Sequence, residues 1–297
     1  MIQRMKSKYA IGIDVGGTHL CSAVVDLLGR ELCSVPVTTP MDSKSPVTEI
    51  LSCFAGNIAA TVRAFGQPVN KIAMAFPGPF EYIRGISLIR GVDKFESLYG
   101  LNVAESVRAL LPEGMAEAEF RFLNDAASFA LAESFCGAGR MFPSIMAITL
   151  GTGFGSGFVR EGHLDTDPDR VPPRGEVWCL PFEGTIADNG FSTRWIIGRY
   201  RELTGRSVPG AREVAEASVA DSAAKQVFTE YGSRLGVFLR PILAHSGAQA
   251  LVIGGSIARS SALFLEPLKA NLGDIPVRIS SLFDQAAMIG AASLFNE

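Results

Sequence analysis

The chain has 297 residues, enough for one large domain or two ordinary ones, because single cores stop growing at about 250–300 residues. Hydrophobic residues make up 47% and charged residues 19%, which indicates a globular and not a disordered protein. The net charge of −3 and the scattered Lys and Arg side chains exclude a strongly basic surface. We therefore expect no nucleic-acid partner.

The cysteines and the N-terminal residues indicate in which cellular compartment the protein is expected. The five cysteines are odd in number and none forms a C-x-x-C pair, so the sequence indicates neither a disulfide framework nor a structural zinc site. Met1–Lys8 carries three basic side chains, and the apolar stretch that follows is broken by Asp14 and two glycines. This is typical of neither a signal peptide nor a membrane span. We expect a cytoplasmic protein with no membrane partner.

Periodicity predicts the elements of the first half of the chain. Apolar positions between residues 47 and 65 follow the i, i+3, i+4, i+7 spacing of a helix. The predicted order is strands over 9–14, 20–26 and 31–38, the helix over 47–65, a strand over 71–76, a helix over 101–111, a strand over 120–123 and a helix over 126–136.

A similar order starts again near residue 144. It comprises strands over 145–150 and 156–160, a polar loop over 165–174, helices over 193–203, 211–217 and 220–245, a strand over 251–253, a helix over 261–272, a strand over 277–280 and a helix over 284–295. The repetition is architectural and not a short-period sequence repeat. It predicts two α/β domains with a cleft between them.

Three glycine turns follow apolar strands. They are Asp14-Val15-Gly16-Gly17-Thr18, Gly151-Thr152-Gly153-Phe154-Gly155 and Gly254-Gly255-Ser256. In the first two, glycines would let backbone N–H groups approach an anion, Thr18 adds a hydroxyl, and Asp14 could hold Mg²⁺ through water. A plain hairpin turn is the alternative for each. The third turn precedes a helix, where backbone can approach a flat ring or a ribose, or simply start a helix with no ligand.

Two common nucleotide motifs are absent from the sequence. A Rossmann fingerprint requires strand, G-x-G-x-x-G loop and helix, whereas the first two turns lead into strands. A Walker loop requires G-x-x-x-x-G-K-[ST], which does not occur.

Asn124-Asp125 lies at the end of one predicted strand and directly before a helix. Ligands of open α/β sheets bind at the carboxyl ends of strands, so Asp125 could accept a proton from a substrate hydroxyl while Asn124 binds a neighbouring one. The alternative is that Asp125 is the N-cap of the helix.

Taken together, the motifs resemble those of the ROK family of sugar kinases (repressors, open reading frames, kinases), in the actin/hexokinase/Hsp70 superfamily. The resemblance extends over essentially the whole chain. The matching segments are IGIDVGGTH (Ile11–His19), FPGP (Phe76–Pro79), LNDA (Leu123–Ala126), LGTGFGSG (Leu150–Gly157), Gly175-Glu176, VIGGSI (Val252–Ile257) and the Ala-Gly-rich segment Ala286–Ala292.

The resemblance implies a fold of two ribonuclease-H-like (actin-like ATPase) domains. The first would comprise residues 1–125 plus 283–297, closed by the last helix, and the second residues 126–282. It also implies a homodimer, ATP and Mg²⁺. The implied nucleotide-binding residues are Gly16, Gly17, Thr18, Gly151, Thr152, Gly153, Gly254 and Gly255.

The resemblance further assigns the sugar site and the acceptor chemistry. Asn124, Asp125 and Glu176 would bind the sugar, with Asp125 as general base, although it can cap its helix as well. The family histidine three residues after the glutamate is replaced by Cys179, and the downstream cysteine-rich zinc motif is missing. We therefore expect no structural zinc. Trp178 could stack on a sugar face, but we expect it in the core.

The leading interpretation is an ATP-dependent kinase that phosphorylates a hexose or a hexose derivative. One alternative is a sugar-sensing transcriptional regulator, whose helix-turn-helix would have to fit into about eight residues before the first strand. Another is a catalytically silent sugar-binding protein. The sequence identifies neither the sugar nor the hydroxyl that is phosphorylated.

Overall fold

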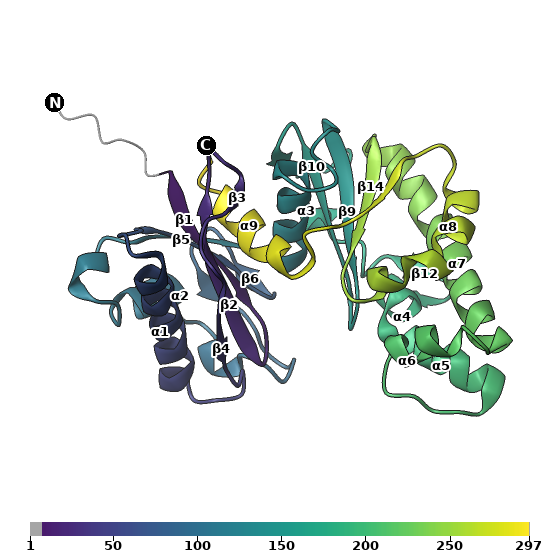
Figure 1. Ribbon diagram of the computed structural model, residues 1–297, viewed down its shortest axis with the longest axis horizontal. Helices are drawn as coiled ribbons and strands as arrows, with labels where there is room; N and C mark the ends of the chain where they lie inside the picture. The colour runs from purple at the N-terminus through teal and green to yellow at the C-terminus, as the bar shows by residue number, and fades with distance from the viewer. Residues whose placement is uncertain (1–7, 297) are drawn as a thin grey trace. The chain divides into compact units, whose positions relative to one another are not determined.

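The structure is a computed structural model that describes residues 8–296 (Figure 1). Residues 1–7 and 297 lie outside the described part, and with them most of the basic N-terminal segment. The contacts between residues of the chain divide it into two compact units. Unit 1 contains residues 8–128 and 284–296, and unit 2 contains residues 129–283. The predicted boundaries, 125/126 and 282/283, differ from these by three residues and by one.

Unit 1 is built on one mixed sheet and a small hairpin. The sheet strands are β1 (Tyr9–Val15), β2 (His19–Asp26), β3 (Glu31–Leu32), β4 (Val37–Pro40), β5 (Lys71–Ala75) and β8 (Glu119–Leu123). Their order is β3-β2-β1-β5-β8, with β4 also paired to β2. β1 runs antiparallel to β2 and parallel to β5, and β5 runs parallel to β8. The hairpin pairs β6 (Phe80–Glu81) with β7 (Ile86–Ser87).

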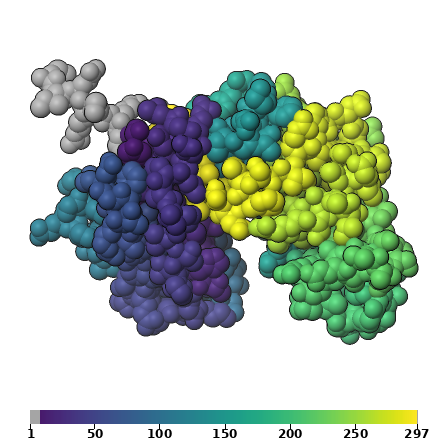
Figure 2. Space-filling view, in the orientation of Figure 1, coloured from purple at the N-terminus to yellow at the C-terminus, as the bar shows by residue number. Residues whose placement is uncertain are grey.

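Helices cover both faces of this sheet. They are α1 (Val47–Phe65), α2 (Val103–Arg108) and α9 (Ala286–Ser293). Ile11 and Ile13 of β1 belong to the same buried cluster as Phe54 of α1. Gly12 points to the opposite face, where a Cβ atom would lie 1.9 Å from the carbonyl oxygen of Met288 in α9. The missing side chain thus lets the C-terminal helix α9 lie directly on β1. On the surface, yellow C-terminal atoms lie beside purple N-terminal ones (Figure 2).

Unit 2 repeats this arrangement of strands. Its sheet contains β9 (Ser144–Leu150), β10 (Phe154–Arg160), β11 (His163–Leu164), β14 (Ala250–Gly254) and β15 (Val277–Ile279). The order is β11-β10-β9-β14-β15. As in unit 1, the first strand is antiparallel to the second and parallel to the next neighbour. A separate hairpin pairs β12 (Pro181–Phe182) with β13 (Thr185–Ile186).

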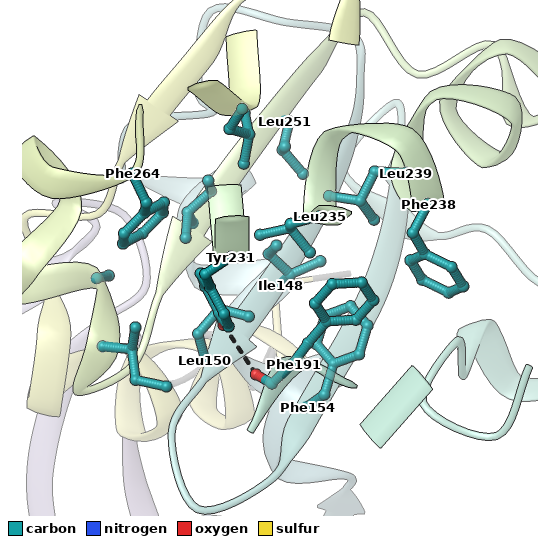
Figure 3. Close-up of a cluster of buried hydrophobic side chains, with 14 of the residues drawn as sticks. Ile148, Leu150, Phe154, Phe191, Tyr231, Leu235, Phe238, Leu239, Leu251 and Phe264 are labelled. Carbon is teal, nitrogen blue, oxygen red and sulfur yellow. Dashed lines mark hydrogen bonds between the residues drawn. The ribbon is translucent and has the colours of Figure 1, made fainter. Parts of the chain in front are cut away.

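The core of unit 2 lies between this sheet and its helices (Figure 3). The helices are α3 (Asp125–Phe135), which begins in unit 1, α4 (Ala187–Phe191), α5 (Thr193–Thr204), α6 (Ala211–Ala217), α7 (Ser222–Ser246) and α8 (Leu265–Leu272). Ile148 and Leu150 of β9 and Leu235 of α7 are fully buried in this cluster. The buried hydroxyl of Tyr231 donates to the carbonyl of Phe191 at 2.8 Å, so this polar group is satisfied inside the core.

Four predicted elements need correction. The helix expected over 101–111 is the shorter α2, Val103–Arg108. The strand expected over 31–38 is two short strands, because Pro36 has no N–H for the ladder and the side chain of Ser34 accepts the Val24 N–H instead. The helix expected over 261–272 is a 3₁₀ helix (Ile257–Leu263) followed by α8, with non-helical backbone at Phe264. The last predicted helix begins as a 3₁₀ turn (Phe283–Gln285) before α9.

Three further short 3₁₀ helices lie in connections, at Glu96–Leu98, Glu113–Met115 and Pro173–Gly175. Between residues 8 and 296, no helix combines the length and the apolar character needed to cross a membrane.

Candidate functional site

The first glycine turn is the tip of the β1–β2 hairpin. The Gly16 N–H donates to the carbonyl of His19 at 3.1 Å, which closes the turn. The carbonyls of Gly17 and Thr18 accept backbone N–H groups from Ser43 and Met41. The amides of Gly17 and Thr18 themselves have no hydrogen-bond partner within the described residues. The turn is thus held by its carbonyls, and two of its N–H groups are left unpaired within the described residues.

The second turn, at the tip of the β9–β10 hairpin, follows the same pattern. Its Gly151 N–H donates to Gly153 at 3.1 Å, and the Gly151 carbonyl accepts both the N–H and the hydroxyl of Thr193. Among residues 8–296, the amides of Thr152 and Gly153 find no acceptor. Each unit therefore carries one hairpin tip with two adjacent unpaired donors, which is suited to an anion.

Asp188 and Arg194 brace this second turn. Asp188 accepts the Phe154 N–H at 2.8 Å and pairs with Arg194, whose other nitrogen lies 3.4 Å from the Thr152 carbonyl. The sequence predicts neither residue, because Asp188 follows Phe154 by 34 positions, Arg194 follows Thr152 by 42, and no local motif marks them.

The glycines of these two turns do not adopt the backbone conformation that only glycine favours. None of Gly16, Gly17, Gly151 and Gly153 has a positive φ. A Cβ atom on Gly17 would meet only the Ser43 hydroxyl oxygen, at an ordinary 3.5 Å. The fold alone therefore does not require glycine at position 17, and the absence of a side chain there favours a ligand over a plain permissive turn.

The third glycine turn has a structural explanation. Gly255 has φ +85°, and a Cβ atom there would lie 2.4 Å from the Leu150 carbonyl oxygen. A pocket of about 440 Å³ opens immediately after it, and Gly254 and Gly255 do not line it. The lining residues are Thr193, Gly210, Ala211, Arg212, Ser256, Ile257, Arg259 and Ser260. Because Thr193 also holds the second turn, the pocket adjoins one of the two candidate phosphate loops.

Asn124, and not Asp125, caps helix α3. The Asn124 Oδ1 atom accepts the N–H groups of Ala126 and Ala127 at 3.0 and 3.3 Å, and its amide nitrogen lies 3.4 Å from the Tyr82 hydroxyl. Asp125 is the first residue of the helix, and one carboxylate oxygen accepts the N–H of Ala126 at 2.9 Å. The N-cap role considered for Asp125 therefore belongs to its neighbour, and this leaves the second Asp125 oxygen for other chemistry.

The carboxylates of Asp14 and Asp125 affect each other. Burial, and next the negative charge of Asp125, raise the pKa of Asp14 to about 6, while His19 acts in the opposite direction. The atoms packed around the Asp125 carboxylate reduce its solvation and so raise its pKa, although part of the residue remains accessible to water. The Ala126 N–H and the charge of Lys94 oppose this increase. This excess of negative charge suits a cation. In the described residues, no three His, Cys, Asp or Glu side chains are close enough together to ligate one directly.

Glu176 lies in unit 2, just after a 3₁₀ turn. Its Oε2 atom accepts from Arg174 at 2.9 Å and from the indole N–H of Trp178 at 3.3 Å. The Trp178 side chain was expected in the core, but the residue is 40% exposed. Its neighbour Val177 is fully buried instead, and Trp178 lies in the turn that the Leu180 N–H closes on the Val177 carbonyl. Cys179, at the position of the family histidine, is exposed.

The model of the ROK family matches residues 10–170, more than half of the chain. The chain belongs to the ROK family. The matched part contains both hairpin tips and Asn124-Asp125, and it ends before Glu176 and Gly254.

Relatives of this ROK chain extend over its full length. It is 26% identical to a glucokinase of Thermotoga maritima, with 97% of each chain covered. It is 25% identical to an N-acetyl-D-glucosamine kinase of Haemophilus influenzae, with 96% of this chain and 98% of that one covered. A ROK glucokinase of Streptomyces griseus, solved with glucose and AMPPNP, superposes with a TM-score of 0.73 at 21% identity, covering 96% and 98% of the two chains. The predicted fold class, with two actin-like ATPase domains, is confirmed.

Proposed function

We propose that this ROK protein is an ATP-dependent sugar kinase that transfers the γ-phosphoryl group of ATP to a hydroxyl of a hexopyranose. The observation that carries the proposal is that one carboxylate oxygen of Asp125 is not used by the helix cap. Asn124 has taken over the helix cap, so a carboxylate oxygen of Asp125 is available at the carboxyl end of a parallel strand. Two sugar kinases are among the relatives that match nearly the whole chain, which supports the same activity.

Asp125 would accept the proton of the attacking sugar hydroxyl, and Asn124 would hold a neighbouring hydroxyl with its amide nitrogen. A raised pKa makes Asp125 a better base provided that it is ionised at the working pH. Glu176 would bind another hydroxyl of the same sugar. Relatives that act on glucose and on N-acetylglucosamine leave the exact hexose open.

The hairpin tips would bind ATP. The unpaired amides of Gly17, Thr18, Thr152 and Gly153 would hold phosphate oxygens, which is most of what phosphoryl transfer requires of a protein. The pocket that Ser256 lines would take the adenosine, and Gly254 and Gly255 form the backbone turn that leads directly to Ser256. Asp14 would hold Mg²⁺ through water, and the ion when bound would neutralise charge on the phosphates.

The test is release of ADP by the purified chain with ATP, Mg²⁺ and a panel of hexoses that includes glucose and N-acetylglucosamine. At least one sugar should be turned over, and Asp125→Asn should reduce kcat roughly 10²- to 10⁴-fold, because it removes the base. The Asp125→Asn variant should still bind ATP, as measured by calorimetry. Absence of turnover with every hexose, although both ATP and a sugar bind, would instead indicate a silent sugar-binding protein.

A further inference from the structure

The segment around Glu176 places an aromatic ring beside a carboxylate that is only half used. Arg174 and the Trp178 indole both donate to Oε2 of Glu176, at 2.9 and 3.3 Å. Within the described residues Oε1 has no partner. One oxygen therefore fixes the carboxylate, and the other is open to a hydroxyl donor from a ligand.

The backbone on both sides of Glu176 is held by a buried hydroxyl. The Ser156 side chain, 3% exposed in β10, donates to the Gly175 carbonyl at 2.6 Å and accepts the Val177 N–H at 3.0 Å. The Trp178 carbonyl accepts the N–H of Asp188 at 2.9 Å. Glu176 and Trp178 are thus presented from a segment that is anchored to the sheet, as a preorganised binding site requires.

An indole that is 40% exposed leaves apolar surface in water, although its N–H is satisfied. A hexopyranose presents two complementary surfaces, a ring face of C–H groups and an edge of hydroxyls. We propose that Trp178 is a sugar-binding and specificity-determining residue, which stacks on the C–H face of the hexopyranose and directs Glu176 Oε1 to one of its hydroxyls. This inference rests on the kinase proposal for its ligand, but its test does not depend on turnover.

The first experiment uses the two tryptophans of the chain, Trp178 and Trp195. Trp195 is partly buried against the core of unit 2, where its ring contacts the Tyr231 ring in a tilted arrangement and the Arg234 guanidinium lies over it. Trp195→Phe therefore leaves Trp178 as the only indole. Titration of this variant with glucose or N-acetylglucosamine, without ATP, should change its emission. The matched variant Trp178→Phe keeps only Trp195 and should show no change.

The second experiment is kinetic. Trp178→Ala should raise KM for the sugar roughly three- to tenfold, the loss expected for one aromatic contact, with KM for ATP within about twofold of the parent value. Trp178→Phe keeps an aromatic ring but loses the N–H that donates to Glu176. Its KM for the sugar should therefore lie between those of the parent chain and Trp178→Ala.

The outcomes separate the two proposals. If the parent chain phosphorylates a sugar and Trp178→Ala leaves KM for that sugar unchanged, the role of Trp178 is overturned and the kinase stands. If the same variant instead changes the sedimentation of the protein, the indole belongs to a contact between copies of the chain. If no sugar is turned over but sugars change the emission of Trp178, the kinase fails and the role of Trp178 stands.

Discussion

At the scale of single residues, the important feature of the two hairpin tips is that their glycines have no side chain. Gly16, Gly17, Gly151 and Gly153 all have backbone angles that other residues adopt. At Gly17 the surrounding protein also leaves ordinary room for a methyl group. A side chain there would stand beside the two unpaired amides. Approach of a ligand would explain the glycine at position 17, which the turn itself does not require.

Gly17→Ala is the sharpest test of that explanation. The stability of the protein should stay within about 0.5 kcal/mol, because the new Cβ atom meets only Ser43 Oγ at 3.5 Å. KM for ATP should rise about tenfold or more, since the methyl group obstructs the phosphate oxygens. Urea denaturation and ADP-release kinetics measure the two effects.

Gly56→Ala is the matched control for this experiment. Gly56 is exposed in α1, and a Cβ atom there meets nothing within 4 Å. This variant should keep KM for ATP and gain up to about 1 kcal/mol of helix stability. An unchanged KM for ATP in Gly17→Ala would show that the tip does not contact the nucleotide.

Other residues at the candidate site could not be assigned from the sequence. Asn and Asp are almost equally good N-caps, so the neighbours Asn124 and Asp125 differ only in which of them precedes the first helical residue. That depends on where α3 starts, and α3 starts one residue before the predicted position. Whether Trp178 or Val177 is buried likewise depends on where the turn after Glu176 begins, which a single sequence does not define.

At the scale of elements, the connection from β10 to Glu176 is held by one carboxylate. Asp165, with its side chain 4% exposed, pairs with Arg160 and Arg170 at 3.0 Å and accepts the N–H of Asp167. Arg160 also donates to the carbonyl of Ser246 at the end of α7. A stretch predicted only as a polar loop is thus tied to two elements of unit 2, and this fixes the approach to Glu176.

Asp165→Asn should therefore lose stability in a pH-dependent way. The hydrogen bonds of Arg170, followed by those of Arg160, lower the pKa of Asp165 from 3.8 to about 2. A lowered pKa stabilises the folded state above the unfolded pKa, and this stabilisation is lost as the pH falls through about 4 to 2. The shift corresponds to about 2 kcal/mol at neutral pH.

Urea denaturation of the parent and of Asp165→Asn at several pH values measures this difference. It should be constant above about pH 5 and shrink towards pH 3. A difference that is absent at pH 7, or that grows as the solution is acidified, would contradict the role of Asp165.

Elements with strong local patterns could be predicted, and surfaces made from distant segments could not. The helical spacing of residues 47–65 and the apolar runs of β1 and β9 ending in glycine turns lead directly to the observed elements. The pocket beside Ser256, in contrast, combines the start of α5, residues 210–212 and the 3₁₀ helix after β14. Their proximity arises from tertiary packing and leaves no periodic signal.

At the scale of the whole molecule, two segments connect the units along the chain. Helix α3 runs from unit 1 into unit 2, and residues 280–286 lead back to α9. The two segments meet at Glu133 of α3, which is fully buried. It accepts the Ser280 hydroxyl and the Ala138 N–H, while Ser280 Oγ in turn accepts the N–H groups of Leu282 and Phe283. One buried carboxylate thus joins both connections.

Ser280→Ala should destabilise unit 2, and more so at higher pH. Burial raises the pKa of Glu133, whereas the Ser280 hydroxyl and the Ala138 N–H stabilise its ionised form. For a carboxyl group with a raised pKa, stability is highest below the unfolded pKa and is lost as the pH rises through the folded one. Without Ser280 the ionised carboxylate loses a donor, so the cost should be about 1–3 kcal/mol at pH 8 and smaller at pH 5.

Both tryptophans lie in unit 2, so their fluorescence during urea denaturation reports on this unit. Ser52→Ala, at an exposed position of α1, is the control and should change stability by less than about 0.5 kcal/mol. An equal loss for Ser280→Ala at pH 5 and pH 8 would mean that the hydroxyl only fills space. A loss that grows with pH would instead show that it stabilises the charge of Glu133, because only the ionised carboxylate depends on that donor.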